Sequence, residues 1–496
     1  MNSEKSLTWE FLKNVAETLD SFRIRALIDG KDDILKAGIY TEDQYHALFF
    51  DMFDLEQLKY ELLTFLKKKS ESNLKDLKTF ITTKKVDLKT VLTLLALLKN
   101  ERLVSIEEIN EQIDTDNENL TFNKLIDFNI KVNSIFPGKT VYEPIQVIFD
   151  AKICSGCGMC AGICPVNCIE IINGIGKVDD NLCIRCGLCY YICPRTFLPT
   201  TSMHMTQMHS NKIEDHGQLG SYIDIFSART KISDIKSVCQ DGGITSSCIY
   251  YLFNSKQIDS ALGAKMSEDP WRPMPFLLGS KEDVISSAGT KYVNNPNLSL
   301  LNDKSLINGN FAIVGVPCHM QALLKSKLYN FQFPSQNNVI YRLGIFCMES
   351  FSYEDGFLKI CNLVDVNVSN VSKTDINKGK FFIYTNDGNE FSVPIKEITH
   401  LARPDCEVCY DLTSESSDIS IGSIGSPSGW NTVIIRTPEG KKLYDELIAN
   451  DIIESVNFND VKPGLSMLQK IARSKKVKCQ KHLDEKRKEN HRFPSY

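Results

Sequence analysis

Two cysteine-rich runs of the same register lie in the middle of this chain: residues 154–165, CSGCGMCAGICP, and residues 183–194, CIRCGLCYYICP. In each run three cysteines are spaced three residues apart, and a fourth follows four residues later, directly before a proline. Thiolates in this spacing are ligands of [4Fe–4S] clusters. Chance is a poor explanation for two copies of one register, so the runs predict a module that transfers single electrons.

The pattern also predicts which cysteines share a cluster. In bacterial two-cluster ferredoxins, the fourth cysteine of each run binds the cluster that the other run holds. We therefore assign Cys154, Cys157, Cys160 and Cys193 to one [4Fe–4S] cluster, and Cys183, Cys186, Cys189 and Cys164 to the other. The alternative is a pair of zinc sites, but these use CxxC pairs without the third cysteine and the trailing Cys-Pro.

Length and composition suggest an ordinary globular chain. Its 496 residues correspond to about three domains of roughly 150 residues each. A hydrophobic content of 42% is sufficient for buried cores. The net charge of −5 argues neither for nor against a nucleic-acid partner.

Cysteine usage indicates a reducing compartment. Nine of the 17 cysteines lie between Cys154 and Cys193 in thiolate-ligand spacing, whereas a secreted chain would use them in disulfides. The opening MNSEKSLTWE lacks the apolar stretch of a signal peptide, and apolar runs such as residues 94–98 are too short to span a bilayer. We expect a cytoplasmic protein that inserts into no membrane directly.

Six segments are expected around the cysteine runs. They are a helical docking domain over residues 1–125, a linker over 126–146, the two-cluster ferredoxin domain over 147–198, a second linker over 199–220, an α/β domain over 221–460, and a basic, solvated helical tail over 461–496. The expected fold class is therefore an α/β core with an inserted α+β two-[4Fe–4S] ferredoxin-like module and an N-terminal all-α domain.

The N-terminal segment is assigned as helical from its periodicity and its capping boxes. Thr41 with Gln44, and Ser105 with Glu108, have the spacing of a helix start. Lysines at 67–69 and 84–85 permit a nucleic-acid interpretation, but no base-reading motif accompanies them. We favour a docking module and expect no nucleic acid. The linker over 199–220 is rich in Met and His without fixed ligand spacing, so we interpret it as a cover or contact segment.

The segment from residue 235 onwards alternates short β-branched runs with helical stretches. Residues 311–316, 342–346 and 431–435 are apolar runs of strand length. Such runs are typical of the buried strands of an α/β domain.

Four further cysteines lie in this α/β segment. Cys318 and Cys347 follow two of the predicted strands, and Cys406 with Cys409 forms a CxxC. The CxxC is moderately specific for a metal or cluster, and the strand-end cysteines are merely available partners. Spacing alone leaves a third cluster open.

Several stretches of this segment resemble a known family. They are residues 228–230 (ART), 240–245 (QDGGIT), 287–292 (SAGTKY), 315–318 (GVPC), 344–347 (GIFC), 406–411 (CEVCYD) and 418–425 (DISIGSIG). In this order they resemble the flavin-bearing beta-subunit family of coenzyme F-420-reducing hydrogenase and F-420H2 dehydrogenase. The resemblance covers roughly residues 147–450.

The resemblance implies an FAD beside a third [4Fe–4S] cluster held by Cys318, Cys347, Cys406 and Cys409. Two positions depart from the family pattern: Thr290 stands where serine is commoner, and Cys239 where alanine is frequent. Thr290 keeps the hydroxyl. We interpret Cys239, like Cys168, Cys248 and Cys361, as a small packing residue.

Candidate cofactor residues follow from the same stretches. The expected FAD contacts are Arg229, Gln240, Asp241, Gly242, Gly243, Ile244, Thr245, Gly289, Thr290, Lys291 and Tyr292. Glycines before a helix allow a phosphate to approach backbone N–H groups. Arg229, Arg272 and Lys291 are candidate cations for the phosphates of FAD or the anionic tail of F-420, with surface charge as the alternative. His319 is a candidate for proton transfer at the flavin, with a structural hydrogen bond as an equal alternative.

The resemblance predicts an F-420-dependent oxidoreductase subunit. A deazaflavin such as F-420 exchanges hydride, an iron–sulfur cluster takes one electron, and a flavin can do both. The expected route runs between F-420H2, FAD and three [4Fe–4S] clusters to ferredoxin or to a heterodisulfide reductase, hydrogenase or dehydrogenase subunit. The alternatives are a ferredoxin-dependent tetrapyrrole-type reductase and an electron-relay beta subunit of a hydrogenase or formate dehydrogenase.

Overall fold

The protein is described by a computed structural model. It describes the continuous stretches 145–183, 188–196, 217–328, 336–489 and 491–494, and shorter pieces at 58, 61–62, 65–66, 68, 72, 74–86, 91, 94–95, 104–108, 128–132, 198, 200, 203, 214–215 and 496. The chain divides into two units: Met1–Pro144 with Ile184–Gly187, and Ile145–Cys183 with Leu188–Tyr496. Each unit is described by itself.

The first unit contains both helix and sheet. Helix α4 (Leu74–Lys84) buries Leu77 and Phe80, and strands β1 (Val104–Glu108) and β2 (Phe128–Val132) pair antiparallel. The prediction of a helix start at Ser105 and Glu108 is therefore wrong, and an all-α domain is not confirmed. Apolar Val104 and Ile106 alternate with polar residues, and this period of two favours a strand over a four-residue capping pattern. Strand β2 lies in the predicted linker over 126–146, and the box at Thr41 lies outside the described residues.

The second unit begins with a small ferredoxin-like module. Its elements are α6 (Gln146–Asp150), α7 (Met159–Gly162), the antiparallel pair β3 (Ile169–Ile172) and β4 (Ile175–Val178), and α8 (Leu188–Ile192). Each cysteine run thus leads into a short helix. After it, Met203 of the expected cover segment is buried against Leu198 and Leu324. This packing supports the interpretation of a cover segment.

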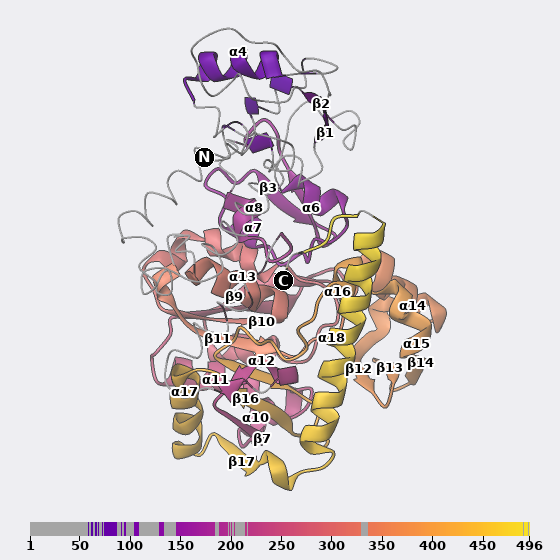
Figure 1. Ribbon diagram of the computed structural model, residues 1–496. Coiled ribbons are helices and arrows are strands. Elements are labelled where there is room, and N and C mark those ends of the chain that lie inside the picture. Colours follow the sequence, from indigo (N-terminus) through magenta and orange to yellow (C-terminus); the bar gives the residue numbers. More distant parts are fainter. Residues whose placement is uncertain are drawn as a thin grey trace. The chain divides into compact units, whose positions relative to one another are not determined.

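A mixed eight-stranded sheet forms the centre of the second unit (Figure 1). From edge to edge its strands are β17 (Ile453–Asn457), β7 (Asp224–Thr230), β16 (Asn431–Ile435), β15 (Ile419–Gly422), β11 (Val339–Ile345), β10 (Phe311–Gly315), β8 (Ser260–Met266) and β9 (Pro273–Leu278). The four strands β15, β11, β10 and β8 are parallel, and antiparallel strands flank them on both sides. The three strands predicted from apolar runs are confirmed as β10, β11 and β16.

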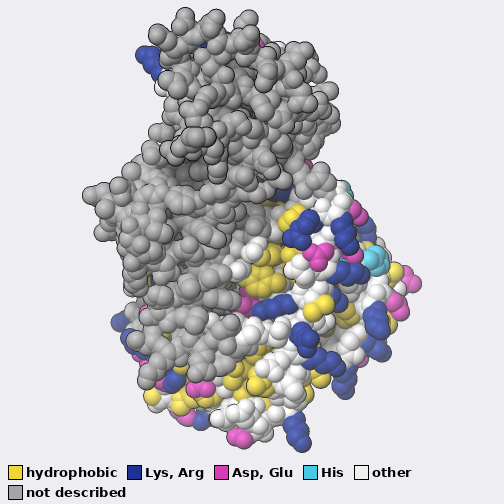
Figure 2. All heavy atoms as spheres, viewed as in Figure 1, with side chains coloured by type: hydrophobic (Ala, Val, Ile, Leu, Met, Phe, Trp, Pro, Cys, Tyr) yellow, Lys and Arg dark blue, Asp and Glu magenta, His cyan; other side chains and the backbone are white. Residues whose placement is uncertain are grey.

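Helix α18 (Gly464–Lys488) is the basic tail, and its burial corrects the prediction of a solvated helix. Leu468 and Ala472 pack with Ile434 of β16, and further along the helix Lys475, Cys479 and Leu483 are also buried. The opposite face carries exposed Lys and Arg side chains, which gather over this part of the surface (Figure 2). The buried residues of α18 recur at helical spacing, but the sequence interpretation overlooked them because the segment is rich in lysine. Among the described residues, none of the helices is apolar over a length that would cross a bilayer.

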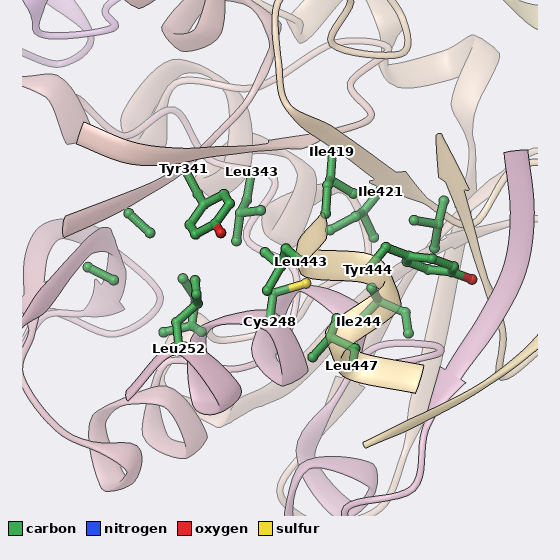
Figure 3. Close-up of a cluster of buried hydrophobic side chains, with 14 of the residues drawn as sticks. Ile244, Cys248, Leu252, Tyr341, Leu343, Ile419, Ile421, Leu443, Tyr444 and Leu447 are labelled. Atoms are coloured by element: carbon green, nitrogen blue, oxygen red, sulfur yellow. The ribbon is translucent and has the colours of Figure 1, made fainter. Parts of the chain in front are cut away.

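Helices cover both faces of the sheet. Ile244, Cys248 and Leu252 of α11 (Ile244–Asn254) and Leu443 of α17 (Pro438–Ala449) pack against the strands on one face (Figure 3). Val433 and Ile435 of β16 point into this core, whereas Ile434 between them points towards α18. This alternation is the normal period of a strand. Cys248 lies in the core, as predicted for a packing residue.

A second, smaller sheet carries its own core. Strands β12 (Val371–Asn377), β13 (Lys380–Thr385) and β14 (Glu390–Pro394) are antiparallel, and Phe351, Phe357 and Phe381 are buried beside them. Cys361 packs in this core, also as predicted. The other elements of the second unit that we describe are β5 (Glu214–Asp215), β6 (Ser221–Tyr222), α10 (Ser233–Val238), α12 (Lys281–Ser286), α13 (Pro317–Leu328), α14 (Leu358–Leu363), α15 (Ile395–Ile398) and α16 (Pro404–Glu407).

Candidate functional site

The first predicted set of cysteines gathers in the ferredoxin-like module. Cys154, Cys157, Cys160 and Cys193 are all buried. Burial raises the pKa of the Cys160 thiol, and the charges of Cys154, Cys157 and Cys193 raise it further. The charge of Cys189, from the second set, also acts on Cys160, so the crossed assignment of Cys193 to the first set stays a prediction.

Polar groups surround this set at hydrogen-bond distance. Backbone N–H groups of Gly156 and Arg195 donate to the sulfurs of Cys154 and Cys193, each over 3.4 Å. The amine of Lys325, itself fully buried, donates to the Cys193 carbonyl over 2.8 Å. Donors of this kind stabilise negative charge on sulfur ligands.

The second predicted set is described in part. Cys164 is buried, Cys183 and Cys189 are half-buried, and Cys186 lies outside the described residues. Cys168 is buried, as predicted for a packing residue, and its sulfur lies 3.4 Å from the sulfur of Cys164. The charge of Cys183 also acts on Cys168. Cys168 is thus a neighbour of this set.

The third set comes from three separate segments. Cys318 and Cys347 follow the carboxyl ends of the neighbouring parallel strands β10 and β11, so the sheet brings them to one edge. Cys406 lies in α16 and Cys409 directly after it, and Ser350 N–H donates to the Cys406 sulfur over 3.4 Å. Burial raises the pKa of Cys347 to about 11, and the charge of Cys409 contributes to the increase. The charges of Cys409 and Cys347 act on Cys318 and Cys406 respectively.

A buried ionic frame links the first and third sets. Asp405 Oδ1 accepts from Arg403 over 3.0 Å, and its other oxygen lies 3.6 Å from Arg195. Arg403 also donates to the carbonyls of Cys154 and Gly174, over 2.7 and 2.8 Å. One carboxylate and two guanidinium groups therefore join the loop of Cys406 to the loop of Cys154.

Lys475 of α18 completes the surroundings of the third set. Its amine donates to the carbonyls of Cys347 and Asp411. Burial by itself would lower the pKa of Lys475, but the charges of Cys409, Cys347 and Cys406 outweigh burial and raise it. The ammonium form of Lys475 is therefore favoured beside these sulfurs.

The donor set fits iron–sulfur clusters better than single metal ions. Among the described residues, no three Cys, His, Asp or Glu side chains approach closely enough to hold one ion. Four sulfurs around a cubane stand further apart than the ligands of one ion, because each binds a different iron. In the first and third sets the buried sulfurs also accept from backbone N–H groups, surroundings that suit thiolate ligands of a cluster.

His319 is committed to the backbone. Its Nδ1 accepts from Val316 N–H over 3.2 Å, and its Nε2 lies 3.0 Å from the Asn295 carbonyl. Burial lowers the pKa of His319 to about 4, so the ring is neutral at pH 7. This placement favours the structural alternative over proton transfer.

The stretches expected to bind FAD meet at the beginning of α11. Gly243, with φ +72°, caps the helix, and a Cβ on Gly242 would lie 2.5 Å from the backbone nitrogen of Asn431. Asn431 accepts from Ile244 N–H over 3.2 Å, whereas Thr245 lies in the first turn, where the helix supplies no acceptor. This end of α11 fits a phosphate.

Two neighbouring contacts hold the loop before α11. Gln240 donates to Asp375 over 2.8 Å, and Asp241 accepts from Ser423. The charges of Asp375 and Asp241 act on Tyr292, which brings the 240–245 and 287–292 stretches together. Thr290 is half-buried beside Gly289, which has φ +86°.

The candidate cations are engaged within the protein. Arg229 pairs with Glu454 and lies 4.6 Å from the Trp430 ring, and Lys291 donates to the carbonyls of residues 287–289. Arg272 pairs with Glu354 over 3.1 Å. Each of these three cations would have to leave its present partner before it could bind a phosphate. The backbone N–H groups at the start of α11 therefore fit a phosphate better than these side chains do.

Sequence reasoning missed Arg195, Asp405, Asn431 and Lys475. Arg195 follows Cys193-Pro194, and Asp405 precedes Cys406, so charge beside a ligand cysteine was an available signal. Asn431 and Lys475 are distant from the motifs in sequence, and only the sheet order and the packing of α18 bring them near.

Comparison with known proteins gives a consistent result. Family models match over three parts of the chain: 4Fe-4S dicluster domain over residues 146–194, and coenzyme F-420 hydrogenase/dehydrogenase beta subunit, N-terminal part over 225–302 and C-terminal part over 308–461. A subunit of the F-420H2 dehydrogenase of Methanosarcina mazei is 33% identical over 348 residues, 70% of this chain and 95% of that protein. Coenzyme F-420 hydrogenase subunit beta of Methanosarcina barkeri is 35% identical over 272 residues, 54% of this chain and 94% of that protein.

A solved structure is also similar. A chain of the F-420-reducing nickel–iron hydrogenase complex from Methanosarcina barkeri, determined with xenon, has a TM-score of 0.53 and 36% identity. The similarity covers 55% of this chain and 95% of that chain.

Proposed function

Because the chain belongs to the coenzyme F-420 hydrogenase/dehydrogenase beta-subunit family, we propose that it is an oxidoreductase subunit that transfers hydride between reduced F-420 and FAD. Single electrons then pass through three [4Fe–4S] clusters to a partner redox subunit. The observation that carries the proposal is the ionic frame of Arg403, Asp405 and Arg195, which joins two buried cysteine sets.

Each proposed cofactor has its own residues. The clusters would be held by the first, second and third cysteine sets as assigned above, and FAD by the start of α11 with the 287–292 stretch. When bound, FAD supplies the conversion between two-electron and one-electron transfer. Gly243 and Thr245 would present backbone N–H groups to a phosphate, and Gly242 permits the close packing against Asn431.

The residues around the cysteines hold charge and exclude water. Lys475 places a cation beside the third set, where it stabilises added negative charge. Burial lowers the pKa of Lys325 well below its ordinary value, and its amine serves as a hydrogen-bond donor to the Cys193 carbonyl beside the first set. The frame around Asp405 fixes the two loops relative to each other. The relatives described above are subunits of F-420 hydrogenase and F-420H2 dehydrogenase, which favours the F-420-linked function over the tetrapyrrole-type reductase.

The test is an anaerobic assay of the full chain after iron and flavin reconstitution. We expect F-420H2 oxidation with viologen as acceptor, inactivity with NADH and NADPH, bound FAD and about twelve irons per chain. Replacing Cys406 by Ser should remove about four irons, whereas Cys248→Ser in the apolar core should remove none. Wild-type protein with full iron and FAD that leaves F-420H2 unchanged would contradict the proposal.

A further inference from the structure

Helix α18 presents two contrasting faces. Its buried face packs on the sheet and, through Lys475, contacts the carbonyl of Cys347 in the third cysteine set. An α-helix is roughly 10 Å thick with its side chains. The outer face of α18 is therefore a surface that lies about one helix diameter from these sulfurs.

The outer face is strongly basic. Of the 25 residues of α18, nine are Lys or Arg and two are Asp or Glu, in a chain whose acidic residues outnumber its basic ones, 62 to 57. Lys470, Arg473, Lys478 and Lys481 are exposed, and they share one side of the helix at 100° per residue. Figure 2 shows Lys and Arg side chains gathered over this part of the surface. Within the described part of the chain, Lys470, Arg473 and Lys478 have no carboxylate at ion-pair distance.

Apolar side chains lie among these cations. Met467 is 38% exposed and Val477 is 61% exposed on the same side of the helix. A helix face that meets only water gains nothing from exposed methyl groups, whereas protein interfaces combine apolar contacts with a charged rim. The combination favours a protein partner over a merely solvated face.

We propose that the outer face of α18, around Met467 and Val477, is the docking surface for a small acidic iron–sulfur electron carrier. The inference rests on the proposed function, because it names the partner of the same redox centres. Charge complementarity selects the partner: an acidic carrier is steered to the basic face, and electron-transfer complexes have small, salt-sensitive interfaces. Docking here brings the carrier close to the third cysteine set.

The test measures binding of an acidic two-[4Fe–4S] ferredoxin to the full, iron-loaded chain at low and high ionic strength. The variant Lys470→Glu/Arg473→Glu/Lys481→Glu should weaken binding at low ionic strength by roughly tenfold or more and remove most of its salt dependence. The control Lys256→Glu/Lys304→Glu/Lys442→Glu reverses the same number of charges at exposed positions elsewhere and should leave the affinity within about twofold. Val477→Ser should weaken the binding that remains at high salt.

The outcomes separate this inference from the proposed function. Unchanged ferredoxin affinity in the α18 variant overturns the inference, as does duplex RNA that binds as tightly as ferredoxin with the same dependence on α18. F-420H2 oxidation with viologen needs no protein carrier. If the wild-type protein fails to catalyse it, the proposed function is contradicted, but the docking surface on α18 is not. Equal viologen rates and iron contents in wild type and variants establish that the variants are folded.

Discussion

Asp405 carries one negative charge between two buried guanidinium groups. It accepts from Arg403 over 3.0 Å and lies 3.6 Å from Arg195, and all three side chains are at most 5% exposed. Asp405→Ala would leave two buried cations without their shared carboxylate. We expect it to lower the free energy of unfolding by roughly 3–5 kcal/mol. Denaturant unfolding under anaerobic conditions measures this loss.

An exposed ion pair supplies the control for Asp405. Asp451, whose side chain is 82% exposed, pairs with Lys231. Asp451→Ala should cost less than about 1 kcal/mol, because water screens the pair. Equal losses in the two variants would show that the frame around Asp405 contributes no more than a surface contact.

Lys475 tests the electrostatics of the third cysteine set. Its cation lies beside Cys347, Cys406 and Cys409, so Lys475→Met should shift the reduction potential of one of the three proposed clusters to a more negative value. A redox titration followed by electron paramagnetic resonance measures the shift. Lys470→Met, on the exposed side of the same helix, should leave all three potentials unchanged. If no reduction potential changes in Lys475→Met, no cluster is bound by the cysteines beside Lys475.

Lys291 gives a pH dependence of stability. Its three carbonyl acceptors favour the ammonium form and burial favours the neutral amine; burial prevails and lowers the pKa to about 8 from 10.5. Between these two values the unfolded chain binds more protons than the folded chain, so stability rises with pH across this range and levels off at its lower value below it. The free energy of unfolding of the wild type should therefore rise across this pH range relative to that of Lys291→Met, which lacks the titrating amine. A constant difference across pH 8 to 10.5 would contradict it.

The loops of the ferredoxin-like module depend on glycines where they meet the sheet domain. Gly158 has φ +86°, and a Cβ there would lie 2.6 Å from Pro296 O and Ser299 N. Gly158→Ala should therefore lower stability by more than the roughly 1–2 kcal/mol cost of a left-handed residue and should reduce iron content. Gly388 has φ +84° with nothing within 4 Å, so Gly388→Ala isolates the backbone cost. Equal melting temperatures for Gly158→Ala and Gly388→Ala would mean that the loop of Gly158 can shift away from Pro296 and Ser299 at no cost.

The elements were predictable where one period dominates the sequence. The buried strands β10, β11 and β16 follow from apolar runs, and the ferredoxin module follows from cysteine spacing. The strand β1 was missed because a short capping pattern was preferred to its alternation, and the buried stripe of α18 was hidden by lysines. Spacing could not establish the third cysteine set, because its members come from three segments that are distant in sequence. Cys318 and Cys347 come to one edge of the sheet only because β10 and β11 are parallel neighbours.

The second unit is held together across its two modules. Asn294 donates to the Ser155 carbonyl over 2.9 Å, and Leu298 N–H donates to the Cys157 carbonyl over 3.1 Å. With Arg403 and Lys325 added, both cysteine runs are attached to the sheet domain. We expect the iron–sulfur absorbance and the far-ultraviolet circular dichroism of this unit to be lost in one coincident thermal transition.

A mutation within this interface provides the check. Asn294→Ala should lower the transition temperature of both signals together, whereas Asn459→Ala, at an exposed position before α18, should lower neither. Iron loss well below the temperature at which the sheet unfolds would show that the modules are independent.

The position of Lys475 and Tyr496 in the chain sets the order of biosynthesis. Tyr496 accepts from Arg195 and donates to the Val408 carbonyl, next to Cys409, and Lys475 contacts Cys347. Both residues follow the cysteines they surround in the chain, so they are synthesised later. The frame of the proposed third site is thus incomplete until α18 and the residues after it have been made, and we expect iron to reach this site well after its cysteines are synthesised.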